Sequence, residues 1–437
     1  MIAAGATLTL DVEKATAGGR MLARHRGQVV LVWGAIPGER VDVRIERTGK
    51  GVAYADTIAV RSPSSDRRPD VGDWRCGGNV FAHVDYPRQL RLKGEIIQDA
   101  FGRIGRFPLS NPPAVVASPE RGYRMRARLH VHEGRVGFYR EGSHDLCDVA
   151  TTGQLLPSTN EWIARAQEIV TRERLADVVA LEISENVAGD ERACHLELRQ
   201  GADRARCQAL AEGVVGLSAH YADRADTIVI SGSPVIHDVI EPRPGEPASA
   251  LRLRRHVRAF FQGNRFLIAR LVSEVVTSVS RGPVVDLYAG GGLLGLSVAS
   301  CGVHPVTLVE GDSTSGADLA LNAAAFPPDV RVERQSVESF LAANSSVDAA
   351  VDTVIVDPPR TGLSKAALSG VVRAKPAQIV YVSCDVPTLA RDARGLIDAG
   401  YGLSRLTALD LFPNTAHVET LAVFSRAEFL TVAYGRT

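Results

Sequence analysis

From about residue 250 onwards, short apolar runs alternate with segments of helical pattern. A strand that is buried on both faces reads as such a run, and a crossover helix joins each strand to a parallel neighbour. The runs that precede a helical segment are 284–288, 305–310, 330–332, 353–357 and 379–383. The last two runs, 406–411 and 420–424, are expected to add antiparallel strands to the sheet. The pattern predicts an α/β fold with a doubly wound, Rossmann-like sheet.

The first part of the chain has a different pattern. Residues 6–61 hold short segments of alternating polarity, separated by Gly-Gly, Pro-Gly and Gly-Lys-Gly turns. This pattern is typical of a small β-barrel. Beyond a polar linker, strands alternate with helices, one of which is expected at 86–102. We therefore predict three domains, namely a barrel at 1–62, a central α+β domain at 70–245 and the doubly wound domain at 250–437.

Charge and cysteine content narrow the class of protein. The formal net charge is zero, which argues against a uniformly basic nucleic-acid coat, but residues 1–150 hold 23 Lys and Arg against 17 Asp and Glu. Local basic surface is therefore expected there. The six cysteines show no paired spacing, and neither a signal-peptide pattern nor an apolar run of about 18 residues is present. We expect a cytoplasmic monomer with free thiols and no membrane partner.

A glycine-rich turn follows the first strand of the doubly wound domain. The run Gly290–Gly295 satisfies G-x-G-x-x-G, and Glu310 ends the next strand, where an acid meets ribose hydroxyls. A nicotinamide dehydrogenase and an S-adenosylmethionine enzyme both fit these features. Asp286 and Tyr288, just ahead of the turn, favour a cofactor that carries a cationic amino group.

Three further strand ends hold a residue whose side chain could take part in catalysis. Asp357 is followed by two prolines, which stiffen the loop and remove backbone donors. Cys384 ends the next strand, and Glu419 begins the last one. Ligands bind at the carboxyl ends of strands in open α/β sheets, so these groups are expected on one rim. Taken singly, each also fits a structural role: a rigid turn, a small apolar residue and a structural acid.

Together these stretches resemble the S-adenosylmethionine-dependent RNA 5-methyluridine methyltransferases. The matching stretches, in the family's order, are 261–264, 286–292, 357–362, 382–385 with 388–392, and 412–419. The resemblance implies a TRAM barrel and a central domain that both contact RNA. It also implies methylation of a uridine, with 23S ribosomal RNA favoured and tRNA as the alternative substrate.

The resemblance assigns roles to individual residues. Cys384 is the implied nucleophile and Glu419 the implied base. The implied cofactor contacts are Gln262, Tyr288, Glu310, Asp357, Asp286 and Gly290. C5 of uracil takes a methyl group only after a thiolate adds at C6, and a base must then remove the C5 proton. An unperturbed thiol has a pKa of ~8.5. We therefore expect the loop to favour the thiolate or to deprotonate the thiol on attack.

One departure from the family concerns metal. Many members with a TRAM barrel bind an iron–sulfur cluster through four cysteines, including a Cys-Gly-Gly-Cys run. Here the run reads Cys76-Gly77-Gly78-Asn79, no cysteine precedes it, and the position near Gly153 is not cysteine. Two cysteines cannot supply four ligands. We predict no cluster and no other metal, with Cys76 packed in the core.

Three arginines stand at alternate positions in the central domain. Arg124, Arg126 and Arg128 would share one face of a strand. A solvated face is the plain interpretation, and contact with RNA phosphates is the functional one. Two other classes also remain open at this point. A base N-methyltransferase would explain the Asp-Pro-Pro loop, and a non-enzymatic RNA-binding protein would explain the barrel.

Overall fold

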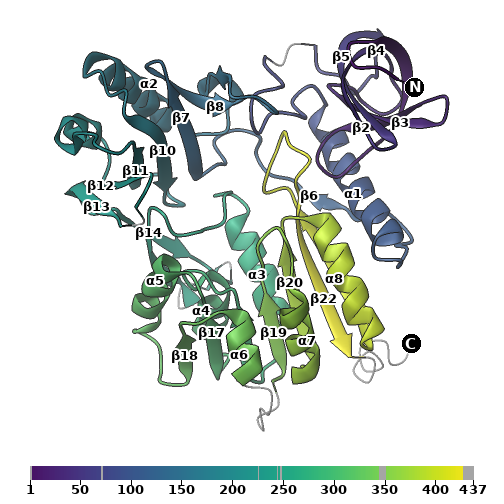
Figure 1. The fold of residues 1–437 in the computed structure, drawn as a ribbon. Coiled ribbons are helices and arrows are strands. Elements are labelled where there is room, and N and C mark those ends of the chain that lie inside the picture. Colours follow the sequence, from purple (N-terminus) through teal and green to yellow (C-terminus); the bar gives the residue numbers. More distant parts are fainter. Residues whose placement is uncertain are drawn as a thin grey trace.

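The computed structural model describes residues 2–69, 72–224, 226–243, 245–246, 249–343 and 351–426. A closed barrel and a seven-stranded sheet lie side by side above an eight-stranded sheet (Figure 1). The predicted fold class is therefore confirmed. The predicted boundaries at 70 and in the linker 242–247 touch residues outside the described ranges, as does the end of the chain after 426.

The barrel is built from alternating residues. Its strands are β1 (Thr7–Ala15), β2 (Met21–His25), β3 (Gln28–Trp33), β4 (Arg40–Gly49) and β5 (Val52–Ser62), in the order β1-β2-β3-β5-β4. Every second side chain points inward, as with Val30 and Val32 on β3, and both are fully buried. Closure leaves no free strand edge.

Helix α1 (Tyr86–Arg103) joins the barrel to the large sheet. It agrees with the helix expected at 86–102, and Pro87 stands in its first turn, where no backbone donor is lost. Leu92 and Ile96 pack into the barrel core, whereas Ile97 and Phe101 pack against the large sheet. The chain then adds β6 (Val115–Val116) to the edge of that sheet. This short edge strand has no clear sequence pattern.

The helices of the central unit pack against one face of its sheet. Its order is β13 (Ile228–Gly232), β12 (Gly216–Tyr221), β11 (Arg192–Leu198), β10 (Val178–Glu185), β7 (Arg126–His132), β8 (Arg135–Tyr139) and β9 (Leu146–Cys147). Helix α2 (Pro157–Arg172) buries Trp162, Ile163 and Val170 against one face, and the one-turn helix η1 (Ala150–Thr152) and helix η2 (Arg204–Ala211) complete the unit. The other face carries Arg126 and Arg128.

A disulfide corrects one expectation. Cys76 and Cys147 are bonded, with their Cα atoms 5.7 Å apart, so the loop before α1 is tied to β9. The expectation of free thiols is wrong for this pair and holds for the other four cysteines. A separation of 71 residues hides the pairing in the sequence. The fold brings the two segments together, because Cys76 forms a β-bridge with Arg140.

The strand order of the large sheet determines where the candidate site lies. Its order is β18 (Val330–Glu333), β17 (Val306–Val309), β16 (Val284–Leu287), β19 (Thr353–Val356), β20 (Gln378–Ser383), β22 (Glu419–Arg426), β21 (Tyr401–Leu409) and β6. The first five strands are parallel, and β22 runs antiparallel to β20 and β21. The strand order reverses between β16 and β19, which opens a crevice at their carboxyl ends.

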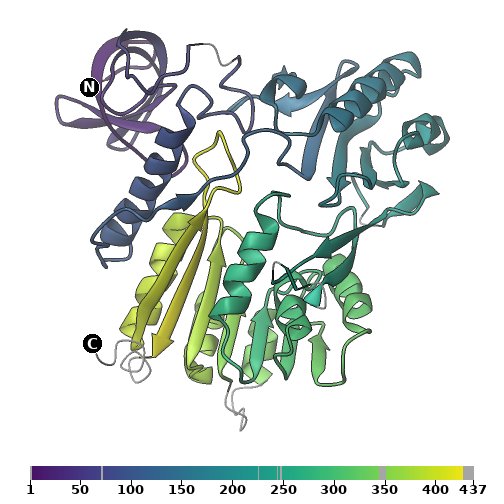
Figure 2. The same ribbon diagram turned by 180° about the vertical axis from the view of Figure 1, so that it is seen from behind.

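Helices cover both faces of this sheet. Helices α3 (Ile268–Ser278), α4 (Leu293–Ser300) and α5 (Ser313–Ala323) lie on the face seen in Figure 2. Helices α6 (Val337–Ala343), α7 (Lys365–Ala374) and α8 (Val386–Asp398) lie on the other face together with α1. The hairpin β14 (Val235–Ile240) and β15 (Leu251–His256) connects the sheet to the central unit. No helix in the described ranges is long and apolar enough to cross a membrane.

Candidate active site

A cavity of about 900 Å³ lies between the carboxyl ends of the large sheet and the central unit. Every residue that the sequence proposed for a site lines it, except Asp286 and Arg128. The residues that do line it are Gln262, Tyr288, Gly290, Glu310, Asp357, Cys384, Glu419, Arg124 and Arg126. The sequence therefore located the cleft, although the roles of these residues stay proposals.

The ends of two paired strands bring Cys384 and Glu419 near each other. Ser383 on β20 pairs with Thr420 on β22, and Cys384 and Glu419 are the adjoining residues just beyond and before this pair. The carboxyl of Glu419 is close enough to raise the pKa of the Cys384 thiol. The thiol and the carboxylate are thus held at the end of the central strands, on the floor of the cleft.

The environment of Cys384 opposes its ionisation. Burial, together with the neighbouring carboxyl of Glu419, raises the pKa of this thiol to about 11, and the guanidinium of Arg360 acts in the opposite direction. Of the two alternatives expected from the sequence, a favoured thiolate does not agree with this raised pKa, and deprotonation on attack remains the prediction. The thiol is protonated at neutral pH.

Two buried carboxyls face the same cleft. Burial raises the pKa of Glu419 well above its usual range, with Asp357 acting in the same direction and Arg360 against it. Burial also raises the pKa of Asp357 to about 7, and a hydrogen bond from Gln262 Nε2 to Asp357 Oδ2, at 3.0 Å, opposes this. A carboxyl with a pKa near neutrality is suited to accept and release protons.

The glycine-rich turn has the predicted geometry. Gly292 is the N-cap of α4 with φ at +97°, and a Cβ there would lie 2.5 Å from Leu296, so only glycine fits. Glu310 at the end of β17 accepts hydrogen bonds from the N–H of Gly290, at 2.7 Å, and of Asp312, at 2.6 Å. Its carboxylate thus stands at the cleft wall beside the turn, where a ribose-binding acid is expected.

Asp286 is placed differently from the other predicted cofactor residues. It lies behind the turn, 1% exposed, and its Oδ2 accepts the N–H of Gly295 at 2.8 Å. Burial raises its pKa to about 8. It faces a small hollow that adjoins the large cleft, because Gln262, Tyr288 and Gly290 line both spaces. In this geometry its carboxyl secures the turn.

The three predicted arginines separate into two groups. Arg124 donates from Nη1 to Gln154 at 2.6 Å, and Arg126 has no hydrogen-bond partner for its guanidinium among the described residues. Burial lowers the pKa of Arg126 to about 10, so it stays charged at neutral pH. Arg128 is paired with Glu182, at 3.2 Å, and with Glu197. It lies outside the cleft.

Several cleft residues had no role in the sequence prediction. Arg360 lies beside Cys384 and Glu419. Phe260 is 61% exposed over the cleft, an unusual position for a large apolar ring. Burial lowers the pKa of His417 to about 4, so its imidazole is neutral. Arg360 and His417 fall within the matched stretches, so their positions were available as a signal.

A buried polar network holds the loop that carries Glu419. Lys93 on α1 is fully buried and bonds Asp410, as well as the carbonyl of Phe412 at 3.0 Å. Gln89, also on α1, donates to Asn414 Oδ1 at 2.9 Å and accepts the Asn414 N–H at 3.0 Å. Helix α1 therefore positions a loop more than 300 residues away in sequence.

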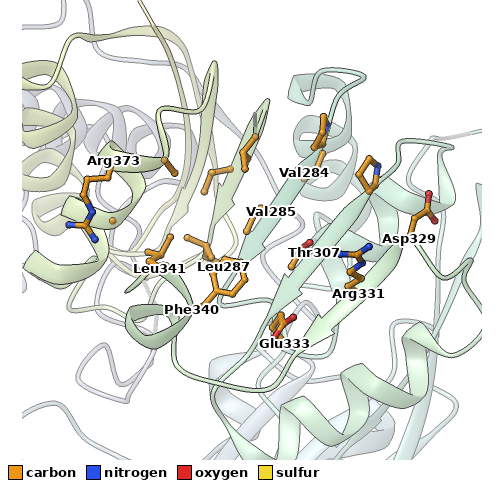
Figure 3. Close-up of a pocket in the computed structure, with 16 residues that line it drawn as sticks. Val284, Val285, Leu287, Thr307, Asp329, Arg331, Glu333, Phe340, Leu341 and Arg373 are labelled. Atoms are coloured by element: carbon orange, nitrogen blue, oxygen red, sulfur yellow. The ribbon is translucent and has the colours of Figure 1, made fainter. Parts of the chain in front are cut away.

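A second cavity, of about 370 Å³, lies far from these groups (Figure 3). Val284, Val285, Leu287 and Phe340 line it on the face covered by α6 and α7, near the amino ends of the strands. It is mainly apolar, and none of the predicted site residues lines it. We assign it no role in the chemistry.

The residues present do not fit an iron–sulfur cluster. Cys76 is engaged with Cys147, and Asn79 offers an amide where the family's Cys-Gly-Gly-Cys run has a thiolate. No group of three or more potential metal ligands occurs in the described ranges. The absence of a cluster remains a prediction. Iron analysis of protein purified without air tests it, and no stoichiometric iron is expected.

Comparisons with protein families identify two matching models. The model described as tRNA (Uracil-5-)-methyltransferase matches residues 250–427, and the TRAM domain model matches residues 4–58. Both agree with the resemblance drawn from the sequence.

Full-length relatives give the same result. The chain is 30% identical to an uncharacterized RNA methyltransferase of Thermosynechococcus vestitus, over 96% of this chain and 98% of that protein. It is 28% identical to the 23S rRNA (uracil(1939)-C(5))-methyltransferase of Cronobacter sakazakii, over 96% of each. The crystal structure of Pyrococcus abyssi tRNA (uracil-54, C5)-methyltransferase with S-adenosyl-L-homocysteine has a TM-score of 0.76 at 24% identity, and it covers 95% of this chain and 99% of that one. That likeness shows a shared fold.

Proposed function

Because the chain belongs to the family of RNA uracil-C5 methyltransferases, we propose that it transfers a methyl group from S-adenosylmethionine to C5 of a uridine in RNA. The observation that carries this proposal is that Cys384 and Glu419 lie near each other, beside the paired ends of β20 and β22, in the cleft that Gly290 of the glycine-rich turn also lines. A dehydrogenase or an amine methyltransferase has no use for that pair.

The proposed chemistry uses the two groups in turn. The sulfur of Cys384 bonds to C6 of uracil while its proton passes to a buried carboxylate of the cleft, for which Asp357 is the candidate, and the electrons of the C5–C6 double bond move toward O4. C5 then becomes nucleophilic and takes the methyl group, and S-adenosylhomocysteine would be the leaving product. Glu419 removes the C5 proton, the double bond re-forms, and the C6–S bond breaks.

The cofactor residues are proposed from geometry. S-adenosylmethionine, when bound, supplies an electrophilic methyl group. Glu310 stands where the cofactor's ribose hydroxyls are expected, the turn at Gly290 gives the backbone a close approach, and Gln262 orients Asp357. Tyr288 adds an aromatic wall. Asp286 supports the turn from behind.

The substrate is proposed to be 23S ribosomal RNA, with tRNA as the alternative. The ribosomal choice is supported by full-length relatives named 23S rRNA (uracil(1939)-C(5))-methyltransferase. The barrel and the central unit are proposed to bind RNA, in a cytoplasmic monomer. Mapping 5-methyluridine in total RNA from a deletion strain identifies the target, because the methylated position disappears.

A trapped adduct tests the mechanism. With RNA that contains 5-fluorouridine and with S-adenosylmethionine, the wild-type protein should form a denaturation-resistant complex, because C5 then carries no removable proton. Cys384→Ala should form none and should transfer no methyl group. If that variant loses only about tenfold in single-turnover rate, about 1.4 kcal/mol of barrier, Cys384 is not the nucleophile.

A further inference from the structure

A third cavity, of about 330 Å³, adjoins the active-site cleft. Segments that are distant in sequence build it, and its main polar groups are Arg68, Asn79, Glu120, Arg121, Thr152 and Asn414. Ligand sites have volumes of roughly 300–1,000 Å³, so the cavity is large enough for a small group such as one nucleotide. None of the roles described above uses it.

The cavity and the cleft share two walls. Gly78 lines the cleft, and its neighbour Asn79 lines the cavity. In the same way, Thr415 lines the cleft and Asn414 lines the cavity. In each of these two segments, adjacent residues line different spaces, so only the local backbone separates the cavity from the cleft. Whatever enters the cavity lies against the back of the loop that carries Glu419.

Two buried amides face this space. Asn414 is 6% exposed, and its Oδ1 is held by Gln89, but its Nδ2 donates to no group among the described residues. Asn79 is 4% exposed, and its Oδ1 accepts no hydrogen bond within the same ranges. A free donor and a free acceptor in the lining of one cavity can both bond to the edge of an unpaired nucleobase.

One positive charge is available at the rim of the cavity. Arg68 makes two hydrogen bonds to the Glu120 carboxylate, at 2.8 and 3.0 Å, so these charges offset each other. The side chain of Arg121 lies over Gly153 and is exposed. It has no hydrogen-bond or ion-pair partner among the described residues. A free guanidinium beside buried amides suits a phosphate attached to a base.

We propose that this cavity holds a second unpaired nucleotide of the RNA, a near neighbour of the uridine in the cleft. Its base meets the amides of Asn79 and Asn414, and its phosphate meets Arg121. The inference rests on the proposed function, since the RNA that presents the uridine also presents this nucleotide. The cavity then contributes to the choice of RNA, because a neighbouring base is read while the target is held.

The test compares Arg121→Glu with Arg135→Glu, a matched control on an exposed part of β8 outside both cavities. The probe is total RNA from a strain that lacks the gene, with tritiated S-adenosylmethionine. Arg121→Glu should raise KM for RNA by about tenfold, with kcat at saturating RNA and the affinity for S-adenosylmethionine unchanged. Arg135→Glu should match the wild type.

Photocrosslinking gives a readout that needs no catalysis. RNA containing 4-thiouridine should crosslink to the peptides around Asn79 and Arg121, and Arg121→Glu should lose these crosslinks. Equal KM values for the two variants, or crosslinks confined to the cleft, would overturn the subsite. Cavity crosslinks without any methyl transfer by the wild type would support the subsite and count against the proposed function instead.

Discussion

At the scale of residues, the thiol of the proposed nucleophile is held in its protonated form. Burial and Glu419 raise the pKa of the Cys384 thiol to about 11, and Arg360 partly opposes them. Below that pKa, the fraction of thiolate rises tenfold for each unit of pH. The positive charge of Arg360 is thus the main local aid to ionisation.

We therefore predict a pH dependence of methyl transfer. The single-turnover rate should rise with pH between 7 and 9, by up to about tenfold per unit. Arg360→Gln should raise the pKa of the thiol further, so its rate at pH 8 should fall and should recover partly at higher pH. Arg394→Gln, on the exposed side of α8, serves as control. A rate that does not change with pH would show that thiol ionisation does not limit the reaction.

The sequence located most of the site residues because their chemistry is local. A glycine turn after a strand, or a cysteine at a strand end, is visible without partners. The pairing of side chains from distant segments was not visible in the sequence. Arg128 is neutralised by Glu182 and Glu197 from two other strands, and Cys76 bonds a cysteine that lies 71 residues away. The protonated state of Cys384 also depends on burial, which no local pattern records.

At the scale of elements, α1 supports the loop that carries Glu419, the proposed base. Lys93 and Asp410 are both fully buried, and the pair connects α1 to the start of that loop. Burial lowers the pKa of Lys93, and Asp410 opposes this. Removing one partner of such a pair leaves an uncompensated buried charge. The sequence predicted α1 itself but not its contact with the loop, since no periodic pattern encodes that contact.

Lys93→Met should therefore destabilise the protein by about 3–5 kcal/mol, measured by urea unfolding. Arg91→Met on the same helix removes only an exposed ion pair with Asp66, and it should cost at most about 1 kcal/mol. The double variant Lys93→Met with Asp410→Leu should recover much of the lost stability, because neither charge remains. If Lys93→Met and Arg91→Met behave alike, the buried pair does not support the loop.

At the scale of the whole molecule, the active site is assembled from two units. The large sheet contributes Cys384, Glu419 and the glycine-rich turn, and the central unit contributes Arg124 and Arg126 to the same cleft. The strand pattern predicted both units. Their relative position was not predictable, because it depends on contacts between segments that are distant in sequence, such as those of Arg255 and Arg265 with Glu185.

This arrangement predicts different effects for two arginines on one strand face. Arg126 faces the cleft with no hydrogen-bond partner for its guanidinium in the described ranges, whereas Arg128 is already paired with two carboxylates. Arg126→Gln should weaken RNA binding. It should also reduce the slope of the logarithm of the binding constant against the logarithm of the salt concentration by roughly 0.7–0.9, the value for one phosphate contact. Arg128→Gln should change neither, and both variants should keep wild-type affinity for S-adenosylmethionine. Filter binding between 50 and 200 mM salt measures the slopes. If both variants bind RNA as the wild type does, the arginine face is only solvated, and the barrel becomes the better candidate for holding the RNA.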